Sequence, residues 1–146
     1  MFMGQFEHTL DPKNRLTIPS PFRPEIERES DGLVVTTGLD QCLFVYPFSE
    51  WKRLGERLSQ HGTTRATNRA FVRLFFAGAH AVQPDGQGRI TLPEPLRDYA
   101  GIQDRVAIIG ARNKFELWQA DRWQSYYEQK RPIFEKLSER IMDLEL

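Results

Sequence analysis

The sequence predicts an α+β fold rich in strands, in which two copies of one motif pair into a single pseudo-symmetric, barrel-like β-unit with flanking helices. Two observations predict it. The chain repeats itself at a spacing of 74 residues, and each copy alternates short strand-like segments with turn residues and helical segments. Each copy also offers too few strands to cover its own apolar face, so we expect the two halves to share one core.

The repeat is clearest around two polar turns. The segment Asp11-Pro12-Lys13-Asn14-Arg15 aligns with Asp85-Gly86-Gln87-Gly88-Arg89. Over residues 2–23, eight of 22 positions are identical in the second copy, where chance would give about one. At a spacing of 72 the match continues through three pairs, Gly38/Gly110, Tyr46/Trp118 and Trp51/Trp123. We interpret the chain as a tandem duplication.

A polar turn separates two strand-like segments in each copy. Alternating apolar residues over positions 2–10 predict a first strand, and residues 16–18 predict a second. Asn14 and Gly88 hold the equivalent place just before the arginine, and asparagine and glycine are the residues that most readily adopt a positive φ. We therefore interpret each segment as a β-hairpin whose turn contains a left-handed residue.

A short helix, two strands and a longer helix follow in each copy. Pro21 and Pro95 suit the first turn of the short helices, and Gly101 is a candidate C-terminal stop. Strands are expected near residues 33–37, 42–46, 106–109 and 115–118. Ser49 and Asp121 are interpreted as N-caps of the helices that carry Trp51 and Trp123.

The repeat divides the chain into four segments. These are a first motif at 5–51, a helical connector at 52–79, a second motif at 80–123 and a C-terminal helix at 124–146. One helix face of the connector carries Phe71, Leu74, Phe75 and Gly78, and another carries Arg65, Arg69 and Arg73. We interpret the arginines as a solvated face or a subunit contact rather than as a DNA site.

Apolar residues recur in the C-terminal segment at a helical spacing, as Phe134, Leu137, Ile141 and Leu144. This spacing suits either packing on the chain's own core or a seam between subunits. We favour packing on the chain's own core.

Composition narrows the functional classes. No apolar run approaches the roughly 20 residues of a membrane span, and the first residues lack the pattern of a secretory signal, so we expect a cytoplasmic protein with no membrane partner. The lone cysteine, Cys42, excludes an intramolecular disulfide and is expected to be buried. Scattered histidines and the absence of a phosphate-binding loop predict no metal, cofactor, small-molecule substrate or enzymatic activity.

The repeated pattern Asp-x-x-Asn/Gly-Arg-x-x-x-Pro, beginning at Asp11 and again at Asp85, resembles the MraZ family. Each half is similar to the SpoVT-AbrB-type swapped-hairpin module, and the resemblance covers essentially the whole chain. It implies a sequence-specific transcription factor that forms a ring-shaped homo-oligomer. The implied partner is double-stranded DNA of the nucleoid, namely short G-rich boxes repeated in the promoter of the division and cell-wall gene cluster.

The resemblance also implies which residues contact DNA. The family's DNA-contacting arginine falls on Arg15 and Arg89, and the neighbouring turn residues complete the predicted set, namely Lys13, Asn14, Gln87 and Gly88. The spacing alone leaves another role open, in which each arginine closes its turn by pairing with the aspartate four residues before it. Asn14 stands where the family commonly has glycine, and asparagine tolerates the same left-handed conformation.

The net charge of the chain is zero, with 20 basic and 20 acidic side chains. A compact DNA-binding module is usually basic. The neutral charge therefore suits an alternative function, an oligomeric scaffold or protein-interaction module that binds no DNA.

Overall fold

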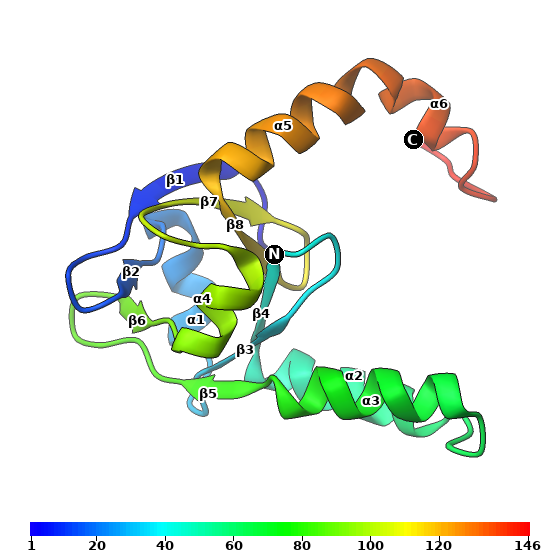
Figure 1. Ribbon diagram of the computed structural model, residues 1–146, viewed down its shortest axis with the longest axis horizontal. Coiled ribbons are helices and arrows are strands. Elements are labelled where there is room, and N and C mark those ends of the chain that lie inside the picture. The colour runs from blue at the N-terminus through cyan, green and yellow to red at the C-terminus, as the bar shows by residue number, and fades with distance from the viewer.

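Strands from the two halves of the chain pair with one another in the computed structural model, which describes all 146 residues (Figure 1). The first half contains β1 (Gln5–Thr9), β2 (Arg15–Thr17), η1 (Ser20–Phe22), α1 (Arg23–Glu27), β3 (Leu33–Thr37), β4 (Leu43–Pro47) and α2 (Phe48–Ser59), and α3 (Ala66–Ala77) follows. The second half contains β5 (His80–Val82), β6 (Arg89–Thr91), α4 (Glu94–Ala100), β7 (Arg105–Gly110), β8 (Phe115–Gln119), α5 (Ala120–Lys130), η2 (Arg131–Ile133) and α6 (Phe134–Ser138). None of these helices combines the length and the apolar content that a membrane span requires.

The sheet topology has a pseudo-two-fold axis. Six strands form an antiparallel sheet in the order β1-β7-β8-β4-β3-β5, and β2 pairs with β6 in a separate ribbon. In the repeat, the strands β1 to β4 correspond in order to β5 to β8. Replacing every strand by its counterpart gives the order of the six-stranded sheet read backwards, and it leaves the β2–β6 pair unchanged. The register follows the same symmetry, since Arg15 lies opposite Thr91 and Thr17 lies opposite Arg89. The predicted pairing of the two motifs into one pseudo-symmetric unit is thus confirmed.

The strands that flank each polar turn do not pair with each other. β1 is hydrogen-bonded along its length to β7, whereas β2 pairs with β6. The local β-hairpin that the turn pattern suggests is therefore corrected, and the swapped-hairpin arrangement that the family resemblance implies is confirmed: each strand takes its partner from the other half. The edge strands β1 and β5 are not hydrogen-bonded to each other, so the sheet is open and its closure into a barrel stays a prediction.

One core joins both halves. Leu16 of β2 and Ile90 of β6 face each other and are completely buried, and both belong to a cluster of 19 buried apolar residues drawn from the two halves. Cys42 is buried as predicted, and burial raises the pKa of its thiol to about 12. The thiol therefore stays protonated at neutral pH and acts as a small apolar side chain.

The helix starts depart from the sequence prediction at two positions. The N-caps are Pro47 for α2 and Gln119 for α5, not Ser49 and Asp121, because each helix begins directly after the preceding strand. The hydroxyl of Ser49 instead donates to Glu29. Pro21 and Pro95 do lie in the first turns of η1 and α4, as expected, and Gly101 ends α4 at a φ of 64°.

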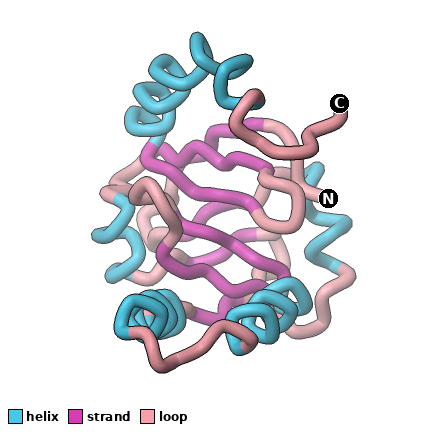
Figure 2. The backbone as a smooth tube through the Cα atoms, turned by 90° about the vertical axis from the view of Figure 1, so that its right-hand side faces the viewer, coloured by secondary structure: helices cyan, strands magenta, loops and turns pink.

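Matching aromatic pairs fix the long helices to the sheet. The ring of Trp51 in α2 packs 5.8 Å from that of Tyr46, and Trp123 in α5 packs 5.3 Å from Trp118. Figure 2 shows α2 and α3 side by side at one end of the sheet and the C-terminal helices at the other. The equal spacing of the two pairs in the repeat thus reflects the same helix-to-sheet packing in both halves.

The apolar residues of α3 and of the C-terminal segment are less buried than the sequence predicts. Phe75 is buried, but Phe71 and Leu74 on the same predicted face are exposed. The predicted packing of the C-terminal residues on the core is wrong, since all four are exposed: Phe134, Leu137, Ile141 and Leu144. The expected continuous helix over 124–146 is also corrected, because Pro132 interrupts it and α6 ends at Ser138.

The shared sheet predicts that the first half cannot fold alone. A fragment of residues 1–62 would lose the partners of β1 and β2, and β3 and β4 would each lose one of their two partners, so much of the common core would be exposed. We expect this fragment to be unfolded, or to dimerise so that a second copy supplies the missing strands. Light scattering and circular dichroism of the fragment beside the full chain would check this, and a stable monomeric fragment would contradict it.

Candidate nucleic-acid interface

Asp11 organises the first polar turn. Its Oδ1 atom accepts the backbone N–H groups of Lys13 at 2.9 Å and Arg15 at 2.8 Å, and its Oδ2 atom accepts the Nε–H of Arg15 at 2.6 Å. Asn14 adopts a φ of 59°, which turns the chain back toward the arginine. The predicted left-handed residue is thus confirmed, and one aspartate fixes both the backbone of the turn and the arginine side chain.

The second turn repeats the same set of hydrogen bonds. Asp85 accepts the backbone N–H groups of Gln87 and Arg89, each at 2.9 Å, and the Nε–H of Arg89 at 2.8 Å. Gly88 has a φ of 72°, equivalent to that of Asn14. The pairing of each arginine with its aspartate, which the spacing left open, is therefore present in both copies.

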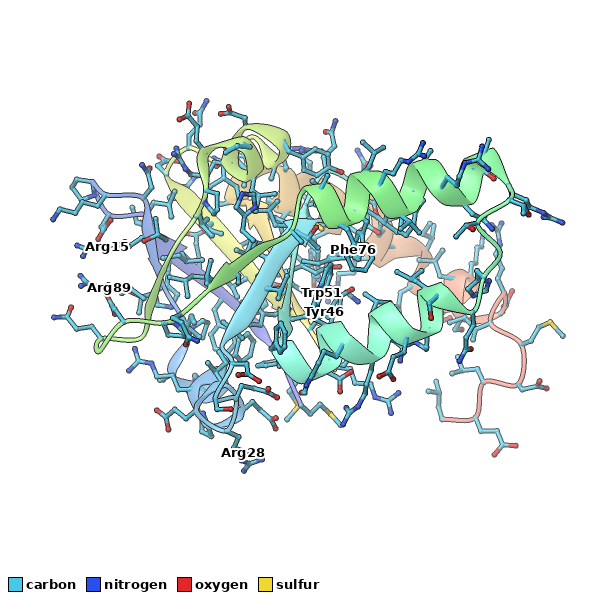
Figure 3. All side chains as sticks on the ribbon, turned by 90° about the horizontal axis from the view of Figure 1, so that it is seen from below. Arg15, Arg28, Tyr46, Trp51, Phe76 and Arg89 are labelled. Atoms are coloured by element: carbon cyan, nitrogen blue, oxygen red, sulfur yellow. The ribbon has the colours of Figure 1, made fainter.

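The two turns are tied to each other. The carbonyl of Asn14 accepts the N–H of Leu92 at 3.0 Å, and the carbonyl of Gly88 accepts the N–H of Ile18 at 2.9 Å. Both arginines consequently lie at one edge of the molecule (Figure 3). The Oδ2 atom of Asp11 is also 3.9 Å from Nη1 of Arg89, so the two guanidinium groups share this carboxylate.

Each arginine keeps its terminal nitrogens available. A guanidinium has five N–H donors, and the aspartate takes only the one on Nε. The Nη atoms of Arg15 and Arg89 donate no hydrogen bond within the chain, and the two side chains are 29% and 24% exposed. The arrangement holds two guanidinium groups by their inner edges, so the outer edges can each form a two-pronged hydrogen bond.

Both aspartates are ionised at neutral pH. Hydrogen bonds from the backbone N–H groups of Arg15 and Arg89 hold the pKa values of Asp11 and Asp85 below their usual range, and the arginine side chains add to this. The carboxylates therefore offset much of the charge of the arginines. This edge of the molecule therefore presents oriented guanidinium N–H donors but little net positive charge.

Arg23 supports the second turn and was not among the predicted site residues. Its Nη2 atom donates to the carbonyl of Gln87 at 3.4 Å, and a Cβ at Gly88 would lie 2.8 Å from its Nε. The equivalent residue in the other half, Arg97, instead donates to the carbonyl of Leu92. The repeat aligns Arg23 with Arg97, and this match could have drawn attention to the position. The contact between Arg23 and Gly88 joins distant parts of the chain, so the neighbouring sequence does not predict it.

The structure brings the remaining predicted residues together at the same edge. Lys13 and Gln87 are exposed at the tips of the two turns, next to Asn14 and Gly88. No group of three or more histidine, cysteine, aspartate or glutamate side chains is arranged to hold a metal ion.

Comparison of the sequence with known proteins identifies the family to which the chain belongs. The family model described as "MraZ protein, putative antitoxin-like" matches the chain twice, at residues 1–74 and 75–144. The chain belongs to the MraZ family. The two successive matches agree with the tandem repeat, and the MraZ family accounts for almost the full length of the chain.

Three relatives extend the comparison. They come from Natranaerobius thermophilus, Heliobacterium modesticaldum and Pediococcus pentosaceus, and each is named "Transcriptional regulator MraZ". Each is 45% identical to this chain over 146 residues, which covers the whole of both proteins. The name describes a regulator of transcription and not a class of enzyme.

The close contact at Gly88 predicts that the two left-handed positions respond differently to substitution. Gly88→Val should cost more than about 1 kcal/mol, because a β-branched residue is strained at positive φ and its Cβ would also meet Arg23. Asn14→Gly should stay within about 0.5 kcal/mol, because glycine adopts the same φ freely. Thermal or urea unfolding of the two variants measures both effects.

Gly86 provides a matched control, because a Cβ there would meet nothing within 4 Å and its φ is not positive. We expect Gly86→Val to leave the free energy of unfolding nearly unchanged. Equal stability of the Gly86→Val and Gly88→Val proteins would contradict the account of the second turn.

Proposed function

We propose that this protein is a sequence-specific DNA-binding transcriptional regulator whose two polar turns contact the DNA. The observation that carries the proposal is the pair of guanidinium groups at one edge, held by Asp11 and Asp85 through Nε, while their Nη atoms donate no hydrogen bond within the chain. The printed names of the relatives support regulation of transcription. Such a regulator would act at the nucleoid.

Arg15 and Arg89 would read the DNA through guanine. An arginine that presents two donors can bond both O6 and N7 of guanine in the major groove, a contact that contributes about 1–3 kcal/mol of discrimination. Lys13 and Gln87 at the tips would contact the phosphate backbone, and Asn14 and Gly88 would let the turns approach it closely. A preference for guanine fits the short G-rich boxes that we propose as the target, in the promoter of the division and cell-wall gene cluster.

Several copies would have to act together. The chain has no net charge, and the two aspartates offset the arginines, so one copy gains little general attraction to phosphate. Linking several weak contacts in one rigid assembly can raise the overall affinity by about 10²–10⁴. We therefore propose a ring-shaped homo-oligomer that binds repeated boxes.

The second candidate function is an oligomeric scaffold or protein-interaction module that binds no DNA. The neutral charge and the exposed apolar residues of α3 and α6 favour it. The scaffold function differs from the DNA-binding function in that it assigns no ligand to the edge formed by Arg15 and Arg89.

Substitution of the turn arginines tests the DNA-binding proposal. Arg15→Ala in every subunit should abolish the mobility shift of box-containing DNA, because it removes the directed donors and leaves Asp11 with only the more distant Arg89 as a charge partner. Arg89→Ala should be the same or milder. Arg28→Ala is the matched control, because Arg28 lies on another side of the molecule (Figure 3). Light scattering should show an unchanged oligomer for all three, and normal DNA binding by the Arg15→Ala protein would refute its assigned role.

The number and phase of the boxes test the need for several copies. We expect three boxes spaced by whole turns of the DNA helix to bind at least about 10²-fold more tightly than one box. Offsetting the boxes by half a turn should remove most of this gain, because a rigid assembly cannot then contact all of them. Mobility shifts at fixed salt measure each affinity, and equal affinity for one box and three would count against the assembly.

A further inference from the structure

The two polar turns differ in the residue at their left-handed position. Gly88 of the second turn has no side chain, and a Cβ there would lie 2.8 Å from Nε and 2.9 Å from Cζ of Arg23. The guanidinium of Arg23 therefore packs directly against the backbone of this turn. Asn14, at the equivalent place in the first turn, carries the Cβ that Gly88 lacks. A guanidinium cannot approach the backbone of the first turn in the same way.

The arginines that the repeat aligns near the two turns form different hydrogen bonds. Nε of Arg97 donates to the carbonyl of Leu92 at 3.1 Å. The corresponding carbonyl for Arg23 is that of Ile18, but Arg23 donates instead through Nη2 to the carbonyl of Gln87 at 3.4 Å. Nε of Arg23 is buried and has no acceptor within the chain. Because an unpaired buried donor is destabilising, the contact with the turn explains the position of this side chain better than its own hydrogen bonding does.

The second turn lies over a cavity and not on a packed surface. The cavity has a volume of about 270 Å³ and is lined by residues of the turn and of α1, among them Arg23, Glu27, Gly86 and Gly88. Residues 85–88 form two hydrogen bonds to the first half, one from Arg23 to Gln87 and one from Ile18 to Gly88. Loss of the Arg23 side chain would enlarge the cavity and remove one of these two bonds.

The position of Gly88 determines the position of the arginine that follows it. Arg89 is the next residue, and its Nε donates to Asp85 of the same turn at 2.8 Å. The guanidinium of Arg89 therefore moves together with the turn. A two-pronged contact of this kind requires its donors to be placed within about 0.5 Å of the productive geometry, so a small shift of the turn would misalign Arg89.

We propose that Arg23 is a positioning residue for DNA recognition, which fixes the second turn through Gly88 and so aligns the guanidinium of Arg89 with guanine. This role rests on the proposed DNA binding, and it requires no contact between Arg23 and the DNA. It also makes the two turns unequal, because the first turn, with Asn14, has no guanidinium against its backbone. Base discrimination should therefore depend on Arg23 but not on its counterpart Arg97.

Two variants of the full chain that separate Arg23 from the turn test this role. Arg23→Ala removes the guanidinium, whereas Gly88→Asn displaces it with a Cβ and keeps a residue type that tolerates a positive φ. The probes are the duplex that the wild-type protein selects from a random pool and an unselected duplex of the same length. The readout is the ratio of the dissociation constants for the unselected and the selected duplex, with thermal melting to show that each variant is folded.

Each variant should lower this ratio at least about tenfold, because the contact of Arg89 with guanine is misaligned. Affinity for the unselected duplex should stay within about twofold, because the phosphate contacts are untouched. The double variant should lose no more than either single variant, since both substitutions break the same contact between Arg23 and Gly88. Arg97→Ala is the matched control and should keep the wild-type ratio.

Salt dependence distinguishes a positioning residue from a residue that binds phosphate. Loss of one phosphate contact reduces the slope of log affinity against log salt concentration by about one. The slope for the unselected duplex should be the same in the Arg23→Ala protein as in the wild type. A reduced slope would make Arg23 a phosphate contact and overturn its positioning role.

The remaining outcomes separate this role from the proposed function. A folded Arg23→Ala protein with the wild-type ratio would overturn the role of Arg23, and so would losses that multiply in the double variant or an equal loss in Arg97→Ala. If the Arg23→Ala protein does not fold, Gly88→Asn decides, and a wild-type ratio in that variant would overturn the role. In all these cases the wild-type protein still discriminates and the DNA-binding proposal stands. Equal affinity of the wild-type protein for both duplexes would overturn the DNA-binding proposal and the role of Arg23 together.

Discussion

Leu16 and Ile90 face each other at the centre of the β2–β6 pair, and both are completely buried. This apolar pair lies at the centre of the pseudo-symmetric ribbon, and a slip of the register by one residue would turn its polar neighbours into the core. Because β2 and β6 meet here, the turn before each strand is carried to the same edge of the molecule. The backbone bonds from Ile18 to Gly88 and from Leu92 to Asn14 then fix the two turns to each other. The candidate interface is a consequence of how the two halves pack.

The pairing of each turn arginine with its aspartate explains how a chain with no net charge can hold guanidinium groups ready to bind a ligand. Each aspartate binds its arginine through Nε and the turn through two backbone amides, so the guanidinium loses little further freedom when it meets a ligand. The carboxylates reduce the net charge of the surface but orient its donors. Such a surface would gain specificity from geometry and depend on repetition for affinity, which is why we propose an assembly of several copies.

The sequence predicted the local features of this arrangement well, because they depend on residues close together in the chain. Asn14 and Gly88 were identified as left-handed positions from their residue types alone, and the aspartate four residues before each arginine was recognised as a candidate partner. The features that the sequence did not predict are set by contacts between distant segments. The partner of β1 is β7, Arg23 lies under a glycine 65 positions away, and the helices after β4 and β8 begin without the expected side-chain caps. Pattern spacing also predicted an apolar helix face in the C-terminal segment, but the packing on the chain's own core that we favoured for it is wrong, because these residues are exposed.

Hydrogen–deuterium exchange on the DNA complex tests most directly whether strand exchange makes the two turns one binding surface. The measurement compares exchange in the segments 11–17 and 85–91 with that in α3, in the free protein and with DNA that carries three boxes. The account predicts that both turn segments exchange more slowly in the complex and that α3 does not change. Protection of one turn alone, or protection confined to other segments, would contradict it.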